Sequence, residues 1–328
     1  MLPFILRRIL LMIPTLAVIS VISFAIIEAP PGDYMDAYVD RLTAQMGTVD
    51  PSEVAALRDR YGLGQPWHVR YWRWISGVMQ GDLGRSMQWN QPVSKLIAAR
   101  LPWSLAVSIS SLVLVYVISI PIGIYSASRQ YSPGDYVATL VGFLGLATPD
   151  FLLALIFLWL YFLWTGNVAV GLFSDQYMTA SWSFAKFLDL MSHIWLPALI
   201  VGTSGTAGLI RIMRANLLDE LQKPYVMVAR SKGLKEGRVL VKYPLRIAMN
   251  PVASTIGWTL PALVNGELLV SMVLGLPTLA PLFVSALLSQ DMFLAGSVVF
   301  ILSTLTLIGT LVSDIVLAWL DPRIREAI

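Results

Sequence analysis

Long apolar runs recur along the chain, and most of the charged residues lie in the shorter segments between them. A membrane-spanning helix needs about 20 consecutive, mostly apolar residues. Six segments meet this requirement, at residues 9–28, 103–127, 137–164, 193–213, 251–275 and 293–320. The pattern therefore predicts an all-α membrane protein with six transmembrane helices.

These spans divide the chain into three predicted parts. Residues 1–28 hold the N-terminal segment and the first helix, residues 29–102 form an extracytoplasmic region, and residues 103–328 form a five-helix core with a cytoplasmic loop at about 214–250. Lys and Arg of short loops accumulate on the cytoplasmic side. Both termini and the basic loop are therefore expected inside, because the short outer loops hold a single cation, Lys186.

The extracytoplasmic region contains two helical patterns. The sequence "DPSEVAALRDRYGL" at residues 50–63 starts with residues that cap a helix and ends near a glycine. The sequence "PWHVRYWRWISGVM" predicts an aromatic amphipathic helix. This second helix suits either the outer membrane surface, where aromatic side chains act as anchors, or the docking of an external partner. The aromatic residues concerned are Trp67, Tyr71, Trp72 and Trp74.

The composition is that of a membrane protein, and it excludes several kinds of catalytic and metal-binding chemistry. Hydrophobic residues make up 56% of the chain and charged residues only 13%, against about a quarter charged in soluble domains. The absence of cysteine excludes disulfides, thiolate catalysis and cysteine-ligated metals. The net charge of +3 follows from basic loops beside the membrane, so it does not indicate a nucleic-acid partner. No G-x-x-x-x-G-K-[ST] motif is present, so the chain does not bind ATP through a P-loop.

The sequence "GTSG" at residues 202–205 matches the serine motif of intramembrane proteases. Its Ser204 would need a histidine base on a neighbouring helix. His193 precedes it in the same predicted span, about 16 Å away along a helix, and no histidine follows. Close packing of small residues against another helix is therefore the better interpretation of this motif.

Ionisable residues inside predicted spans are candidates for function. Glu267 lies in the fifth span, Asp314 lies near the inner end of the sixth, and Asp150 follows Pro149 in the third. These residues leave open a proton-coupled secondary transporter that uses Glu267 or Asp314. The simpler interpretation is that each carboxylate faces a partner helix, a water-filled path or, for Asp314, a loop cation.

The most unusual stretch is "VARSKGLKEGRVLVKYPLRIAMNP" at residues 228–251. It carries six cations opposed only by Glu236, so it lies outside the hydrocarbon. Gly233 permits a left-handed backbone, which would end one short helix and start another at an angle. Anionic headgroups would account for the charge. They would not account for two hinged helices whose apolar sides suit a partner's groove.

This stretch resembles the cytoplasmic signature loop of ABC importer permeases of the dipeptide/oligopeptide/nickel family. The resemblance rests on "ARSKGL" and "VLVKYPLRIAMNPV", and it extends over nearly the whole chain. Similar segments are "LRRILLMIPTL", "RYGLGQPWHVRYWRW" with "GDLGRSM", "PVSKLIAARLPWSL" and, near the C-terminus, "LDPRIR". Because these motifs occur in the family's order, the resemblance is not a chance match, and it implies that the chain is the first of two non-identical permeases.

The resemblance implies a type I ABC importer permease in the bacterial inner membrane, without an enzyme activity or cofactor of its own. Its expected partners are a second homologous permease in a heterodimer, two ATP-binding subunits that hold ATP and Mg²⁺, and an extracytoplasmic solute-binding protein. The aromatic residues Trp67–Trp74 would face the binding protein, and Asn265 and Glu267 would line the path. The expected ATPase contacts are Ala229, Arg230, Lys232, Gly233, Leu234, Lys235, Leu245 and Arg246.

The transported solute stays open at this point. Peptide permeases of this family commonly have the sequence pattern F-x-x-P-G-L-G near the fifth span. This chain has Leu274, Gly275, Leu276 and Pro277 instead. The resemblance therefore allows an oligopeptide, an oligosaccharide, an opine or nickel, and this departure points toward a related non-peptide solute such as an oligosaccharide.

Overall fold

A computed structural model describes residues 2–28, 65–86, 88–168 and 170–320. The predicted helix at residues 50–63 and most of the C-terminal motif lie outside these residues. The chain divides into two compact units. One comprises Met1–Ile9, Trp103–Ala280 and Leu305–Ile328, and the other comprises Leu10–Pro102 and Pro281–Thr304.

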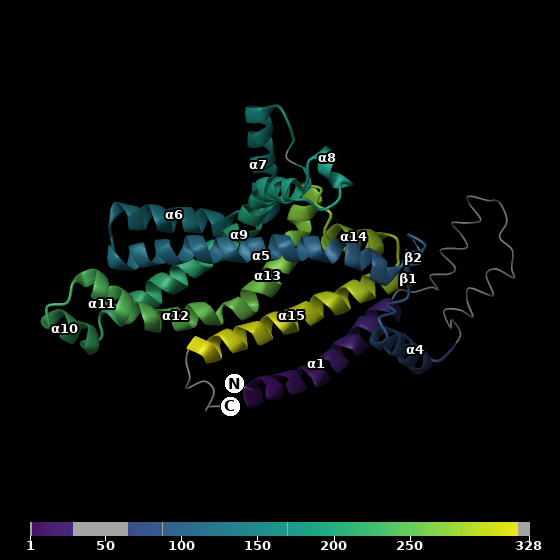
Figure 1. The fold of residues 1–328 in the computed structure, drawn as a ribbon, viewed down its shortest axis with the longest axis horizontal. Helices are drawn as coiled ribbons and strands as arrows, with labels where there is room; N and C mark the ends of the chain where they lie inside the picture. The colour runs from purple at the N-terminus through teal and green to yellow at the C-terminus, as the bar shows by residue number, and fades with distance from the viewer. Residues whose placement is uncertain (1, 29–64, 87, 169, 321–328) are drawn as a thin grey trace. The chain divides into compact units, whose positions relative to one another are not determined.

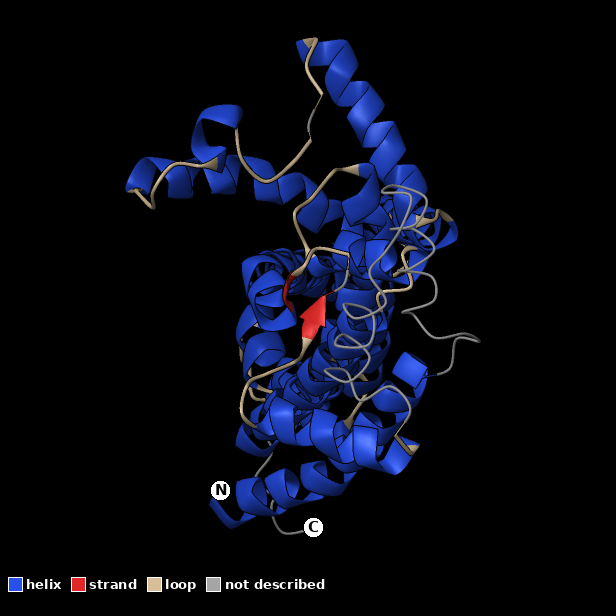
Figure 2. Cartoon of the chain, turned by 90° about the vertical axis from the view of Figure 1, so that its right-hand side faces the viewer, coloured by secondary structure: helices blue, strands red, loops and turns tan. Residues whose placement is uncertain are grey.

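Helices account for nearly all of the regular structure, as Figures 1 and 2 show, which confirms the all-α prediction. The exception among the described residues is a two-residue antiparallel ladder in which Arg85 pairs with Pro92. The elements are α1 (Leu2–Glu28), α4 (Trp67–Met79), β1 (Arg85–Ser86), β2 (Gln91–Pro92), α5 (Val93–Ser128), α6 (Pro133–Ala147), α7 (Asp150–Thr165), α8 (Asp175–Met178), α9 (Phe184–Leu221), α10 (Pro224–Ser231), α11 (Glu236–Lys242), α12 (Pro244–Ser254), α13 (Ile256–Val273), α14 (Leu279–Leu288) and α15 (Met292–Leu320).

Four described helices are long and apolar enough to cross a membrane, and these are α1, α5, α9 and α15. The third predicted span is not one straight helix, because α6 and α7 meet at a bend of 106°. Thr148 has an extended backbone with ψ of 124°, as a residue before proline prefers. Pro149 then stands as the N-cap of α7. Counting this bent pair as one span gives five, so the described residues support four or five spans rather than six.

The fifth predicted span, residues 251–275, is also divided. Pro251 lies inside α12, and α13 begins only after Thr255. The predicted helix therefore starts later than the apolar run suggests, because Thr255 ends one helix and caps the next. The short apolar helix α14 was not predicted as a separate element.

The larger unit packs α5, α9, α12 and α13 together. Val115, Met213, Leu217 and Val252 are 1% exposed or less and form one cluster within it. The small residues of α9 allow a close approach to α5. A Cβ added at Gly202 would lie 3.1 Å from Val115 Cγ2. The "GTSG" motif therefore packs against a neighbouring helix, as its small residues predict.

The smaller unit holds α4 against neighbouring helical segments. Trp74 packs against Phe24 and Phe300, with ring centroids 5.7 and 6.0 Å away. Asp291 is fully buried and accepts hydrogen bonds from Ser86 Oγ and from the backbone N–H of Gln88. It also accepts one from the N–H of Leu294 in the first turn of α15. One carboxylate therefore ties the β1–β2 turn to the start of α15.

Candidate coupling and translocation sites

The basic stretch forms two short helices, α10 and α11, separated by Gly233. Pro224 occupies the first turn of α10, where a missing N–H costs nothing. Gly233 has a φ of +72° and donates its N–H to Arg230 O at 2.9 Å, which ends α10 in a left-handed residue. Figure 1 shows α10 and α11 side by side at one end of α9 and α12. The predicted hinge of two helices at this glycine is confirmed.

An apolar cluster holds α10 and α11 together. Val226, Ala229 and Val239 are 0%, 5% and 1% exposed, and they pack with Leu234 and the rings of Tyr225 and Tyr243. Ala229 and Leu234 were predicted to contact an ATPase, but Ala229 is buried and Leu234 is partly buried in this cluster. Leu245 likewise packs into the core around Val252. These residues shape the segment instead of forming its outer surface.

The outer surface of the segment carries cations, the paired Glu236 and three apolar side chains. Exposed positions predicted from the sequence are Arg230, Lys232, Gly233, Lys235 and Arg246. Met227 and Val228, each 54% exposed, and Val241, 63% exposed, were missed by the prediction. The sequence shows these apolar residues among the cations, but only the structure shows that they are exposed and so form a candidate contact surface.

Two polar contacts brace the segment. Arg230 donates to both carboxylate oxygens of Glu236, at 2.9 and 3.3 Å, and so links α10 to α11 across Gly233. Both side chains are exposed, so this pair contributes at most about 1 kcal/mol. Tyr225 donates its hydroxyl to Glu220 in the last turn of α9. Burial, followed by this hydrogen bond, raises the pKa of Tyr225 above its usual value.

The aromatic helix α4 presents only part of its predicted docking set. Trp67 and Trp72 are 60% and 69% exposed, whereas Trp74 is 6% exposed and belongs to the core. Tyr71 is partly buried and shares a hydrogen bond of 2.8 Å with Ser20 Oγ. The prediction is therefore wrong for Trp74, since the helix turns that side chain inward. Trp67 and Trp72 are left as its outer aromatic surface.

Glu267 does not line an open path in this structure. Its side chain is 1% exposed and accepts hydrogen bonds from Ser104, Ser108 and Ser271 at 3.2, 3.2 and 3.3 Å. The sequence could not reveal these donors, because Ser104 and Ser108 belong to α5. The side chain of Asn265 lies outside the described part of the structure.

The remaining carboxylates predicted from the sequence have different surroundings. Asp314 forms an ion pair with Arg8 at 3.2 Å, so its partner is a cation of α1 rather than of a loop. Asp150 stands at the first position of α7, and its Oδ1 is buried without a hydrogen-bond partner among the described residues.

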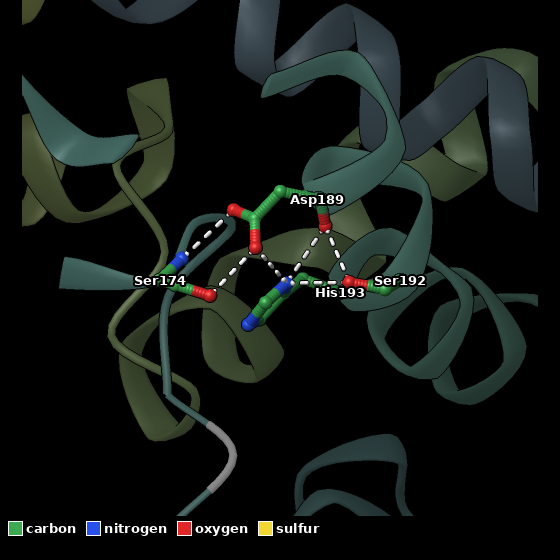
Figure 3. Close-up of polar contacts among 4 residues, drawn as sticks. All are labelled: Ser174, Asp189, Ser192 and His193. Atoms are coloured by element: carbon green, nitrogen blue, oxygen red, sulfur yellow. Dashed lines mark hydrogen bonds and ion pairs between the residues drawn. The ribbon is translucent and has the colours of Figure 1, made fainter. Parts of the chain in front are cut away.

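His193 is engaged in a polar cluster at the start of α9, drawn in Figure 3. Its Nδ1 lies 2.7 Å from Asp189 O and 3.1 Å from Ser192 Oγ. The Asp189 carboxylate accepts from the N–H and hydroxyl of Ser174, at 2.9 and 2.6 Å. The cluster fastens the loop before α8 to α9. None of these hydrogen bonds reaches Ser204, so the geometry gives no support to a protease. Among the described residues, no group of three or more His, Asp or Glu could hold a metal ion.

Comparison with known proteins identifies the family. Residues 119–326 match the binding-protein-dependent transport system inner membrane component, and residues 1–109 match the N-terminal part of such membrane components. The chain belongs to this family of permeases. As a binding-protein-dependent permease, it is an inner-membrane component of an ABC transport system and not itself an enzyme.

Several full-length relatives are similar to this permease. It is 37% identical over 323 residues to the oligopeptide transport system permease protein AppB of Bacillus subtilis, covering 98% of this chain and 99% of that protein. It is 30% identical to the dipeptide transport system permease protein DppB of Escherichia coli K12, covering 99% of each. It is 31% identical to the glutathione transport system permease protein GsiC of Salmonella paratyphi A, again covering 99% of each.

Proposed function

We propose that the chain is the transmembrane permease subunit of an ATP-driven, binding-protein-dependent importer for short peptides. The observation that carries this proposal is the similarity to oligopeptide, dipeptide and glutathione permeases along almost their whole length. The oligosaccharide favoured by residues 274–277 finds no support in these relatives, which are named for peptides. Among the described residues, Glu267 accepts hydrogen bonds from serines and Asp314 is paired with Arg8, so each carboxylate has a structural partner.

The proposed topology has six transmembrane helices with both termini cytoplasmic, arranged as a type I importer permease. The bent α6–α7 pair would be the third span and α13 the fifth. The three sequence parts, 1–28, 29–102 and 103–328, would be the first helix, the outer region and the core. Its proposed partners are a second permease, two ATP-binding subunits and a solute-binding protein.

The segment formed by α10 and α11 is the proposed contact for the ATP-binding subunits. Its exposed cations and its exposed apolar side chains, Met227, Val228 and Val241, would meet the ATPase surface. The buried cluster around Val226 and Val239 packs the two helices against each other, so they would move together. The Tyr225–Glu220 hydrogen bond and the packing of α12 against α9 would carry a movement of the two helices into the spans. Trp67 and Trp72 would face the solute-binding protein.

Reconstitution tests the proposal. The permease would be purified with its associated subunits, placed in liposomes and supplied with the solute-binding protein. We expect uptake of short peptides that requires ATP and continues when the proton gradient is collapsed. An uptake that stops with the gradient, or a preparation from which no ATPase subunit co-purifies, would overturn the proposal. Uptake of oligosaccharides alone would overturn the peptide assignment only.

A further inference from the structure

A groove in the larger unit contains a carboxylate that no described residue balances. It has a volume of about 310 Å³ and lies between α7, α9 and α13, which Figure 1 draws close together. This volume is at the lower end of the range of about 300–1,000 Å³ found for ligand sites. Among the described residues that line it, Asp150 is the only charged one.

The groove runs lengthwise along two helices. Its wall on α9 is formed by positions spaced three and four residues apart, which are Val201, Ser204, Gly205, Gly208, Leu209 and Ile212. The opposite wall has the same spacing, with Thr255, Thr259, Ala262, Leu263 and Gly266. Such spacing places each set on one helix face. Eleven residues of helix span about 16 Å, which matches an extended peptide of about four or five residues.

Small residues keep the groove open. A Cβ placed on Gly208 would meet no heavy atom within 4 Å, so that part of the wall faces free space. At the other end, a Cβ on Gly266 would lie 3.6 Å from Asp150 Oδ2. The carboxylate therefore lies over the bare backbone of α13 at one end of the groove. Its other oxygen, Oδ1, is buried without a donor among the described residues.

A buried carboxylate oxygen without a donor is costly, so this arrangement is suited to an incoming cation or hydrogen-bond donor. The other described lining residues carry hydroxyls and apolar side chains but no positive charge. A short peptide has a charged group of the right sign at its amino terminus. The hydroxyl of Ser204, singled out above as a protease nucleophile, would then belong to a binding wall.

We propose that this groove is a solute site of the permease, in which Asp150 binds the terminal ammonium of a peptide lying between α9 and α13. The proposal rests on the proposed function for the identity of the solute. The charge preference of the groove does not depend on it and can be measured separately.

The chain has no cysteine, so a single introduced thiol can report on the groove. Gly208→Cys would be introduced into the assembled complex and treated with a positively charged and a negatively charged methanethiosulfonate. We expect the cationic reagent to react at least about tenfold faster, because the Asp150 charge attracts it. Asp150→Asn should remove most of this preference. Asp219→Asn, which removes an exposed carboxylate from the same helix α9, is the matched control and should preserve it.

Peptide transport supplies the second readout. A peptide with a free amino terminus should slow the modification of the thiol introduced by Gly208→Cys, whereas its N-acetylated form should not. Asp150→Asn should lower uptake of the free peptide about tenfold or more and change uptake of the acetylated peptide less than about twofold.

Three outcomes would overturn this inference. A reaction of the introduced thiol without charge preference would exclude an active carboxylate, and equal protection by both peptides would exclude an ammonium site. The third outcome combines two results: the introduced thiol does not react, and the second permease is lost from Asp150→Asn preparations. Together they would mean that a basic side chain of the second permease fills the groove and pairs with Asp150. A wild-type complex that imports no peptide would instead refute the proposed function, while the charge preference of the introduced thiol would still decide the chemistry of the groove.

Discussion

The sharpest test of the coupling segment compares two of its glycines. Gly233 and Gly237 lie four residues apart, and a Cβ added to either would meet no heavy atom within 4 Å. They differ in backbone, because Gly233 has a φ of +72° while Gly237 lies inside α11. Alanine at Gly233 therefore costs about 1–2 kcal/mol through the left-handed backbone alone. Alanine at Gly237 should stabilise α11 by up to about 1 kcal/mol.

A cost of that size lowers the population of the native hinge about 5- to 30-fold relative to its opened forms. Gly233→Pro is more severe, because proline fixes φ near −65° and removes the N–H that bonds to Arg230 O. The predicted order of ATP-dependent uptake is wild type and Gly237→Ala, then Gly233→Ala, then Gly233→Pro with almost none.

The assay measures uptake and ATP hydrolysis in liposomes, with the apparent melting temperature of the complex as a control for folding. Because a Cβ at either glycine meets no heavy atom of the permease within 4 Å, the melting temperature should change little among these variants. Wild-type uptake by Gly233→Pro would refute the coupling role. Equal losses in Gly233→Ala and Gly237→Ala would refute the backbone argument, since only one of these positions has a positive φ.

Four other substitutions test the remaining assignments. Glu267→Ala should lower the melting temperature by the equivalent of about 2–4 kcal/mol, because it leaves three serine hydroxyls without their acceptor and opens a cavity; an unchanged melting temperature would contradict this role. Trp74→Ala should destabilise by about 3–5 kcal/mol, whereas Trp72→Ala should keep the melting temperature and weaken stimulation by the solute-binding protein; the reverse result would mean that α4 faces the other way. Tyr225→Phe should cost about 1 kcal/mol by removing the hydrogen bond to Glu220. Because the pKa of Tyr225 is raised, this contribution is present below about pH 10 and is lost as the pH rises through the folded-state pKa. The stability of the wild type should therefore approach that of Tyr225→Phe at strongly alkaline pH. A constant difference in stability between the two proteins would contradict the role of this hydrogen bond.

The positions of most helices and the bend of the coupling segment could be predicted from the amino-acid sequence alone. Apolar runs long enough to cross a bilayer are a local property, so α1, α5, α9 and α15 follow from them. The glycine hinge is equally local, because φ of +72° at Gly233 suits glycine and no other residue nearby. The break of the third span could also have been predicted from the sequence, because proline restricts the backbone of the residue before it. The continuous apolar run on both sides of the proline led instead to the prediction of a single helix.

Which face of each element is buried follows from the packing of the folded chain and could not be predicted from the sequence. Trp72 and Trp74 are the same residue type in the same helix, yet Trp72 is exposed, whereas Trp74 packs between Phe24 and Phe300. Glu267 was predicted to line the path, but in the structure it accepts hydrogen bonds from two serines of α5. The reason is that burial and hydrogen bonding depend on contacts between segments far apart in sequence, whereas helix formation and chain turns depend mainly on neighbouring residues.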